Sequence, residues 1–275
     1  MRHKPNMMEN RICFQTISNS HINSKTLDPC KMPHQKAYLV TGANRGIGFE
    51  LVSQLSADSS NIVYGTARDL ASAAGLKKLA SSHPNFKPLE ADVVKPETLK
   101  SVADVVAKEH GYVDVLIANA GIAETYSPVK DVSLDELSRH WDVNTKGAVI
   151  TYQAIRPLVV KSQEKKIVFI SSLAGSVAGF FPMPNPAYGS SKAALNYIIR
   201  SISAESEGEG LKVLSMHPGM VATDMGKRGL TKIDVSSMNI AVISPEESAR
   251  AILEQIEKLD ETDKFLSYDG TTASW

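Results

Sequence analysis

From Tyr38 onward the chain alternates short apolar segments, rich in strand-forming residues, with longer segments of helical periodicity. The apolar segments are AYLV, NIVYGTA, FKPLEADV, VDVLIANA, KIVFISS, LKVLSMHP and KFLSYDG. Such alternation predicts a parallel sheet whose connecting helices cover both faces. The near-continuous apolar character of the segments agrees, because strands of such a sheet are buried on both sides. We therefore expect an α/β fold with a doubly wound parallel sheet of about seven strands.

The helical segments give further detail. They are expected to start at or near residues 47, 71, 96, 134 and 188, with an interruption of the fourth at Asn144. A last helix is expected from Ser244 to about Asp260, because Ser244, Pro245 and Glu247 form the pattern of a capping box with proline at the first helical position. No repeat or linker divides residues 37–275, so one domain accounts for them.

Residues 1–36 differ from the rest, being rich in Asn, Ser, His and Lys without helical or strand periodicity. We expect this extension to be disordered. Both cysteines, Cys13 and Cys30, lie in it, which leaves residues 37–275 without the means to form a disulfide or a thiolate metal site.

The charge balance argues against polyanionic partners. Lys plus Arg and Asp plus Glu number 30 each, so nucleic acid and anionic membranes are not expected to bind. No apolar run approaches the roughly 18 residues of a membrane-spanning helix. We expect a cytoplasmic protein.

The first apolar segment runs directly into the turn TGANRGIG, which opens a helix. Glycines in such a turn let the backbone approach a pyrophosphate, whose charge then meets free N–H groups at the helix N-terminus. The spacing is G-x-x-x-G-x-G and not the more familiar G-x-G-x-x-G. We expect a Rossmann-type dinucleotide site here. Its residues in the turn are Gly42, Asn44, Arg45, Gly46, Ile47 and Gly48.

The segment GTARDL, at the end of the second apolar segment, bears on which dinucleotide binds. An acid there would bind the ribose 2′-hydroxyl of NADH, whereas an arginine would accept the 2′-phosphate of NADPH. Arg68, with Arg45 as a second guanidinium, favours NADPH over NADH. The alternative is that Arg68 is an ordinary surface arginine and that Asp69 binds the ribose.

The segment AYGSSKAAL places a tyrosine four residues before a lysine in an expected helix. Residues i and i+4 share a helical face, so Tyr188 and Lys192 can both face one site. A neighbouring positive charge favours the phenolate and lowers the tyrosine pKa. We predict that Tyr188 gives or takes a proton and that Lys192 tunes it.

Considered together, the motifs resemble those of the short-chain dehydrogenases/reductases in order and spacing. They are TGANRGIG at 41–48, NAG at 119–121, Asn144, the serine pair at 171–172, Y-x-x-x-K at 188–192 and PGMVAT at 218–223. PGMVATDMG and FLSYDGTTASW are similar to the corresponding segments of the NADPH-dependent carbonyl reductase branch of this family. That branch includes sniffer-type carbonyl reductases and C-factor-like proteins. YLVTGANRGIG and ALNYIIRSI are similar to fungal norsolorinic acid ketoreductases. One departure is Ala118, where the family's N-N-A-G has its first asparagine.

The resemblance implies a catalytic set of Ser172, Tyr188, Lys192 and Asn144. Ser172, chosen over Ser171, would polarise the carbonyl oxygen, and Lys192 would also hold the nicotinamide ribose. Asn144 would interrupt its helix and hold a water that relays protons toward Lys192. Without the resemblance, the two serines are a plain strand end and Asn144 an ordinary helix interruption.

The resemblance also implies further cofactor contacts. Asp92 would meet the adenine with Val93 nearby, although an acid after a strand is otherwise usually a helix N-cap. It places Asn119, Ala120 and Gly121 near the adenosine ribose. It places Pro218, Val221 and Thr223 around the nicotinamide carboxamide.

The loop between Ser172 and Tyr188 carries Phe180, Phe181 and Met183. Over a reaction centre these side chains would favour an apolar carbonyl substrate. The alternative is that they pack against the protein's own helices. The polar segment 224–243 could form a mobile lid.

We predict an NADPH-dependent reductase of a ketone or aldehyde, and more narrowly a polyketide ketoreductase. The alternatives are an NAD-dependent alcohol dehydrogenase and a dinucleotide-sensing regulator without turnover, against which the set of Ser172, Tyr188 and Lys192 argues. His217 is given no catalytic role, and the remaining histidines lack the spacing of metal ligands, so no metal site is expected. A homo-oligomer is expected by analogy with the family.

Overall fold

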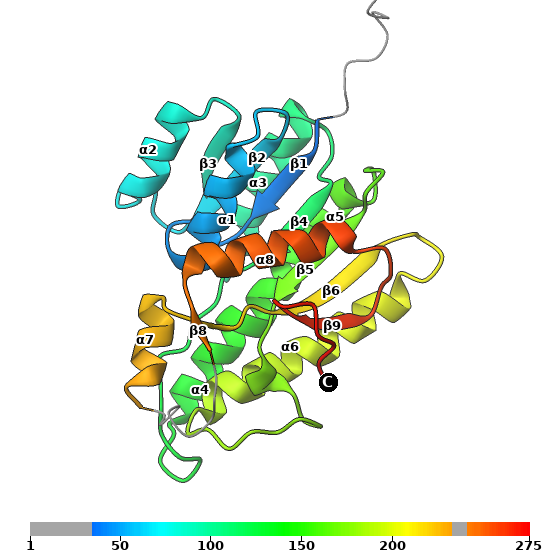
Figure 1. Ribbon diagram of the computed structural model, residues 1–275. Coiled ribbons are helices and arrows are strands. Elements are labelled where there is room, and N and C mark those ends of the chain that lie inside the picture. Colours follow the sequence, from blue (N-terminus) through cyan, green and yellow to red (C-terminus); the bar gives the residue numbers. More distant parts are fainter. Residues whose placement is uncertain (1–34, 233–240) are drawn as a thin grey trace, which may run out of the picture. The chain divides into compact units, whose positions relative to one another are not determined.

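The computed structural model describes residues 35–232 and 241–275, and Figure 1 shows their arrangement. Seven parallel strands form one sheet in the order β3-β2-β1-β4-β5-β6-β9, which confirms the expected doubly wound α/β fold. The strands are β1 (Ala37–Val40), β2 (Ile62–Ala67), β3 (Phe86–Glu90), β4 (Val115–Ala118), β5 (Lys166–Ile170), β6 (Lys212–His217) and β9 (Lys264–Ser267). Every residue of β1, β4 and β5 is buried, as strands covered on both faces require.

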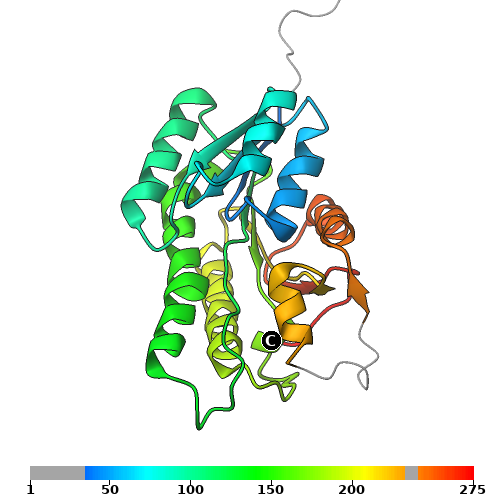
Figure 2. The same ribbon diagram turned by 90° about the vertical axis from the view of Figure 1, so that its left-hand side faces the viewer.

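Helices cover the two faces of this sheet, as Figure 2 shows with the sheet between them. One face carries α1 (Gly46–Ser56), α2 (Ala74–Ser82) and α8 (Pro245–Lys258), and the other carries α3 (Pro96–Glu109), α5 (Gly147–Val159) and α6 (Pro186–Glu205). Their buried apolar side chains form two separate clusters, one on each face of the sheet. The apolar stripes of the helices thus bury both sides of the strands.

β1 is the point at which the direction of the connections reverses. Tyr38 of β1 pairs with Val63 of β2 on one side and with Val115 of β4 on the other. The loops after β1 and β4 therefore diverge, and a crevice forms outside the carboxyl ends of these strands, where open α/β sheets bind ligands. The glycine turn and the Asn119 segment both follow these strands directly.

Two helices begin elsewhere than expected. α2 begins at Ala74 and not near residue 71, because the Asp69 carboxylate accepts the Ala71 N–H at 2.7 Å and holds a turn ahead of the helix. α6 begins at Pro186, two residues before Tyr188, because proline is favoured in the first turn of a helix. The backbone N–H that proline lacks would have no hydrogen-bond partner at this position.

The interruption expected at Asn144 is a π-helical turn. α4 (Leu134–Trp141) continues through Asp142–Lys146 into α5 without leaving helical geometry. Within this turn the Gly147 N–H donates to the Asp142 carbonyl oxygen, five residues earlier. A turn of this kind inserts an extra residue and frequently marks a functional site.

The segment after β6 contains elements that the sequence did not predict. β7 (Met220–Val221) and β8 (Val242–Ile243) pair in parallel, and α7 (Asp224–Leu230) follows β7. Residues 233–240 lie outside the described residues, so the mobile lid over 224–243 stays a prediction. The capping box of α8 is confirmed, with Ser244 and Glu247 each bonded to the other's backbone N–H.

The expected extension falls largely outside the described residues as well. Residues 1–34, with Cys13 and Cys30, belong to that part, and the disorder predicted for residues 1–36 stays a prediction. Across 35–232 and 241–275, none of the helices combines the length and the apolar character that a membrane crossing needs.

Candidate active site

A cavity of about 640 Å³ lies along the carboxyl ends of the central strands. Its walls come from the loops that follow these strands and from the first turns of α1 and α6. The predicted cofactor residues in its walls are Gly42, Asn44, Arg45, Gly46, Ile47, Gly48, Arg68, Asp92, Val93, Asn119, Ala120, Gly121, Tyr188, Lys192, Pro218 and Thr223. Residues distant in the chain are thus brought to one place.

Backbone atoms of the glycine turn form one wall of the cavity. Gly42 and Gly46 have φ angles of +66° and +55°, which favour glycine. A Cβ on Gly48 would lie 2.2 Å from the Gly42 carbonyl oxygen, so no larger residue fits there. Arg45, at the N-cap of α1, makes no side-chain cap, and the first turn of α1 contains no acid. The free N–H groups of this turn therefore fit a pyrophosphate.

Val221 is the predicted cofactor residue that does not line the cavity. It is only 5% exposed and pairs with Ile243 in the small β7–β8 sheet. Ala222 lines the cavity instead, because successive residues of an extended chain point to opposite sides. Ile170 and Met225 also line it, and they carry no motif by which the sequence could have shown this.

Two guanidinium groups flank the cavity beside β2. Arg45 and Arg68 are both exposed and line it, and within the described residues neither forms an ion pair with an acid. Asp69 also lines the cavity, but its carboxylate accepts the N–H groups of Ala71 and Ser72. Hydrogen bonds from the Ser72 side chain and from these N–H groups hold the pKa of Asp69 below its usual range. The geometry favours a phosphate at the arginines over a ribose at Asp69.

Tyr188 and Lys192 share one face of α6, as their spacing predicts. The Lys192 ammonium lies 5.9 Å from the centre of the Tyr188 ring. Lys192 is 4% exposed and donates to the carbonyl oxygen of Ile170 at 2.7 Å. That bond ties the helix to the end of β5, two residues before Ser172.

Ser172 meets Tyr188 because a glycine lets two segments approach closely. Ser172 follows the end of β5 by two residues, and its hydroxyl oxygen accepts the Ala174 N–H at 3.1 Å. A Cβ on Gly175 would lie 2.5 Å from the backbone carbon of Lys192, so the turn after Ser172 packs directly on α6. Ser171 also lines the cavity, but its hydroxyl donates to the Asn196 side chain at 2.6 Å. Of the two serines, Ser172 is the one beside the tyrosine.

The pKa of Tyr188 does not move in the expected direction. Burial raises it to about 12, while a side-chain hydrogen bond with Ser172 opposes the rise. Burial also lowers the pKa of Lys192 to about 8. Lys192 is therefore neutral at the pH at which Tyr188 ionises, and its charge does not contribute to the shift of the Tyr188 pKa. The expectation that Lys192 lowers the Tyr188 pKa is therefore wrong for these side chains, since loss of hydration outweighs their mutual effect.

Asn144 lies behind this site and not in the cavity wall. Its side-chain oxygen accepts the Ile122 N–H at 2.8 Å, and its nitrogen donates to the Ile122 carbonyl oxygen and to Ser191 at 2.9 Å each. The π-helical turn presents this side chain between the segment after β4 and α6. Asn144 therefore holds the two together, and the relay water remains a prediction.

Asn119 and Asp92 have structural partners as well as places at the cavity. The Asn119 amide donates to the carbonyl oxygens of Thr41 and Gly42, which joins the ends of β4 and β1. Asp92 accepts the Val94 N–H at 3.3 Å in a tight turn. It is not the N-cap of α3, because that position belongs to Lys95.

His217 has the packed role expected of it. Its Nδ1 accepts the Leu173 N–H at 3.4 Å, and burial lowers its pKa to about 4 although Asp269 opposes the shift. Across the described part of the chain, no group of three or more His, Cys, Asp or Glu side chains is arranged to hold a metal ion.

The loop between Ser172 and Tyr188 projects its aromatic side chains outward. Phe180 is 75% exposed and Phe181 39% exposed, so neither is packed into the core as the alternative reading required. The Ala178 N–H donates to the backbone oxygen of Trp275 at 2.9 Å, which fastens the loop to the last residues of the chain.

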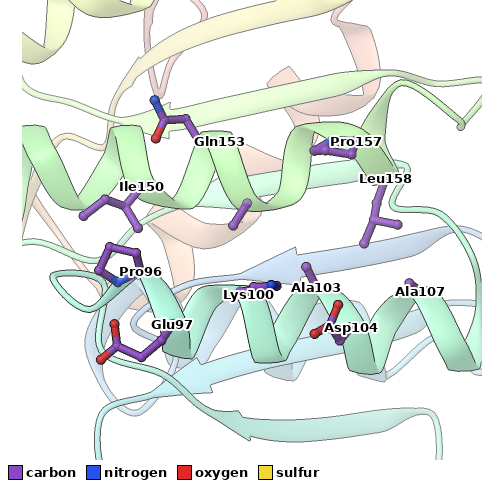
Figure 3. A pocket seen from close by; sticks show the side chains of 11 residues that line it. Pro96, Glu97, Lys100, Ala103, Asp104, Ala107, Ile150, Gln153, Pro157 and Leu158 are labelled. Atoms are coloured by element: carbon purple, nitrogen blue, oxygen red, sulfur yellow. The ribbon is translucent and has the colours of Figure 1, made fainter.

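A second hollow, of about 600 Å³, lies between α3 and α5 (Figure 3). Ile150 and Leu158 of α5 point toward α3, whose Glu97, Lys100 and Asp104 supply the charged part of the lining. None of the predicted site residues reaches this groove. The chemistry described above belongs to the cavity at the strand ends.

Comparison with known proteins agrees with this geometry. The family model for short chain dehydrogenases matches residues 36–234. An uncharacterized oxidoreductase of Schizosaccharomyces pombe is 38% identical over 245 residues, with 86% of this chain and 97% of the relative covered. An uncharacterized oxidoreductase of Saccharomyces cerevisiae is 37% identical, with coverages of 85% and 95%.

Solved structures of carbonyl reductases are also similar. The NADPH-bound carbonyl reductase from chicken fatty liver superposes with a TM-score of 0.79 at 32% identity, covering 87% of this chain and 99% of that one. Carbonyl reductase Sniffer of D. melanogaster superposes with a TM-score of 0.78 at 29% identity, covering 88% and 100%. The resemblance inferred from the motifs is thereby confirmed.

Proposed function

The chain belongs to the short chain dehydrogenase family, and we propose that it is an oxidoreductase that reduces a ketone or aldehyde with NADPH. The observation that carries the proposal is the meeting of Ser172, Tyr188 and Lys192 beside the cavity of the glycine turn. Two similar solved proteins are carbonyl reductases, one of them bound to NADPH, which supports the same reaction class.

The residues of the cavity fit a dinucleotide phosphate. Gly42, Gly46 and Gly48 expose backbone N–H groups that would hold the pyrophosphate. Arg45 and Arg68 would hold the 2′-phosphate, since guanidinium groups pair well with phosphate oxygens. When bound, NADPH supplies the hydride that reduces the carbonyl carbon.

The chain's own side chains supply the proton. The Ser172 hydroxyl oxygen accepts the Ala174 N–H, and its own proton, which faces Tyr188, would turn to hold a substrate carbonyl oxygen. Tyr188, with a pKa of about 12, stays protonated near neutral pH and remains more acidic than an aliphatic alcohol. Proton transfer from Tyr188 to the developing alkoxide is therefore favourable. Lys192 keeps ammonium protons beyond the one given to Ile170, and these would hold the nicotinamide ribose.

The loop between Ser172 and Tyr188 and two sequence segments bear on the substrate. Phe180 and Phe181 are exposed on the loop that follows Ser172, although neither lines the cavity, and contact of a substrate with them would favour an apolar carbonyl compound. The likeness of YLVTGANRGIG and ALNYIIRSI to norsolorinic acid ketoreductases supports the narrower proposal of a polyketide ketone. The homo-oligomer and the cytoplasmic location stay predictions.

A direct assay tests the reaction. Purified protein is mixed with NADPH, or with NADH, and with a panel of aromatic and aliphatic ketones, aldehydes, diketones and quinones, and the nicotinamide absorbance is followed. We expect turnover with NADPH to exceed turnover with NADH. Oxidation of alcohols by NAD+ without carbonyl reduction would instead indicate a dehydrogenase. Tight NADPH binding with no turnover of any member would indicate the sensing role.

A further inference from the structure

The turn between β6 and β7 contributes Pro218 to the wall of the cavity. The pairing of β6 with β9 ends at His217, and the pairing of β7 with β8 begins at Met220, so Pro218 and Gly219 lie between the two ladders. Proline has no N–H to donate, and its carbonyl oxygen is the backbone group by which this part of the turn can be fastened.

Ser248 of α8 supplies a partner for that oxygen. Its hydroxyl donates to the Pro218 carbonyl oxygen at 2.7 Å, and the residue is fully buried. Ser248 lies in the first turn of α8, whose start is fixed by the capping box at Ser244 and whose Pro245 also lines the cavity. β8 leads directly into this helix, as Figure 1 shows. The start of α8 and the turn after β6 are therefore joined at the cavity.

The next residue of the turn is held by packing. Gly219 has a φ of +89°, and a Cβ on it would lie 2.9 Å from the Tyr268 ring and 3.0 Å from the Ile243 side chain. The close packing of Gly219 and the hydrogen bond from Ser248 thus fix the turn by two independent contacts. Of these two, the bond from Ser248 acts on the residue that lines the cavity.

Pro218 and Arg68 belong to opposite ends of the cavity. Arg68 follows β2 and Pro218 follows β6, with β1, β4 and β5 between these strands. Four strand spacings of about 4.8 Å separate β2 from β6 by roughly 19 Å. β6 adjoins β5, the strand that leads to Ser172, so the Pro218 end is that of the proposed hydride transfer. A shift of Pro218 should therefore affect the nicotinamide and not the 2′-phosphate.

We propose that Ser248 is a positioning residue for the nicotinamide of the cofactor. Its hydroxyl holds the Pro218 carbonyl oxygen and thereby sets the part of the cavity wall against which the nicotinamide lies. Ser248 does not line the cavity itself and acts through Pro218. Removal of the hydroxyl leaves the Pro218 carbonyl oxygen without this donor and lets the turn shift. The inference rests on the proposed function and deepens it.

Two ligands distinguish the two ends of the cavity. NADPH and 2′-phospho-ADP-ribose, which is the same molecule without its nicotinamide, are titrated calorimetrically into the wild-type protein and its variants. In Ser248→Ala we expect the Kd for NADPH to rise about fivefold to tenfold and the Kd for 2′-phospho-ADP-ribose to stay within about twofold. Ser248→Cys should show the same selective loss, because a thiol fills the space of the hydroxyl but donates only weakly.

Ser56→Ala is the matched control. Ser56 is a buried serine at the end of α1, and its hydroxyl donates to the Val52 carbonyl oxygen at 2.6 Å. Its replacement removes a bond of the same kind at the end of the helix opposite to the glycine turn. Both Kd values should stay within about twofold of those of the wild-type protein.

The outcomes separate this inference from the proposed function. Equal weakening of both ligands in Ser248→Ala would assign Ser248 to the general support of α8 and overturn the inference. So would an unchanged Kd for NADPH, or wild-type affinity for NADPH in Ser248→Cys. A selective loss of NADPH affinity supports the inference even where no carbonyl compound is reduced, so failure of the proposed reaction alone is distinguishable. A wild-type protein that binds neither ligand would overturn both.

Discussion

The Lys192 ammonium donates a hydrogen bond of 2.7 Å to the carbonyl oxygen of Ile170, the last residue of β5. This bond fixes α6 against the strand that leads to Ser172. The helix that carries Tyr188 and the strand end that carries Ser172 are consequently held as one unit, although they come from separate parts of the chain. Preorganisation of this kind would place the proposed proton donor before the substrate arrives.

Replacement of Tyr188 by phenylalanine removes the proposed proton donor and little else. We expect kcat for carbonyl reduction to fall by about 100-fold or more, while the Kd for NADPH changes by less than about threefold. Tyr197→Phe is the control, because this tyrosine lies on the same helix with 74% of its surface exposed. Fluorescence titration and steady-state rates measure the two quantities. A variant that kept its full rate would show that another group supplies the proton.

The low pKa of Lys192 predicts a pH dependence. Lys192 is charged below its pKa of about 8 and loses its proton as the pH rises through that value. NADPH affinity and kcat/KM should therefore fall between pH 7 and pH 9 with an apparent pKa near 8, because kcat/KM reports the free enzyme. Lys192→Ala should bind NADPH more weakly and lack this step. The same step in the variant would assign it to another group.

Arg68 is predicted to set the preference for NADPH. Loss of a charge-assisted bond to the 2′-phosphate in Arg68→Ala should lower kcat/KM for NADPH by about tenfold to a hundredfold and leave that for NADH nearly unchanged. The matched control is Arg250→Ala, whose guanidinium pairs with Glu254 on the surface of α8. Unchanged rates with both cofactors would indicate that Arg68 is an ordinary surface arginine and that Asp69 binds the ribose.

Gly48 is predicted to tolerate no side chain. A Cβ there would lie 2.2 Å from the Gly42 carbonyl oxygen and 2.5 Å from the Asn119 side chain, both of which are fixed. Gly48→Ala should weaken NADPH binding by more than about tenfold and lower the melting temperature by a few degrees. In Gly75→Ala the new Cβ meets the Phe49 ring at 3.0 Å, and the ring can shift, so binding should persist. Calorimetry and titration compare the two.

His217 is predicted to matter for stability in acid and not for catalysis. Burial lowers its pKa from 6.5 to about 4, so between these values the unfolded chain binds a proton that the folded chain does not. Stability therefore falls as the pH drops from 7 to 5, by about 2 kcal/mol from this group. His217→Gln should show a smaller loss of melting temperature over that range and retain its activity at pH 7. An inactive variant with an unchanged acid response would contradict both parts.

Much of the fold could be predicted because local patterns determine it. Strands buried on both faces must be apolar throughout, and the capping box at Ser244 marks a helix start on its own. Tyr188 and Lys192 were predictable as a pair because helical periodicity alone places them on one face.

The remainder depends on contacts between distant segments, which no local pattern records. Val221 turns away from the cavity because it pairs with Ile243, and Ala222 lines the cavity in its place. The raised pKa of Tyr188 reflects burial, a property of the whole fold. The motifs therefore predicted the class of chemistry, whereas the residues that line the cavity could be found only from the structure.

The pairing of β1 with β4 affects how the molecule assembles. Two segments separated by β2, β3 and their helices must meet before the crevice at the strand ends exists, and such non-local closure is slow. A nascent or partly folded chain thus lacks the surface that a dinucleotide recognises. Stabilisation by a bound dinucleotide then applies to the finished domain alone, so it slows unfolding rather than hastening folding.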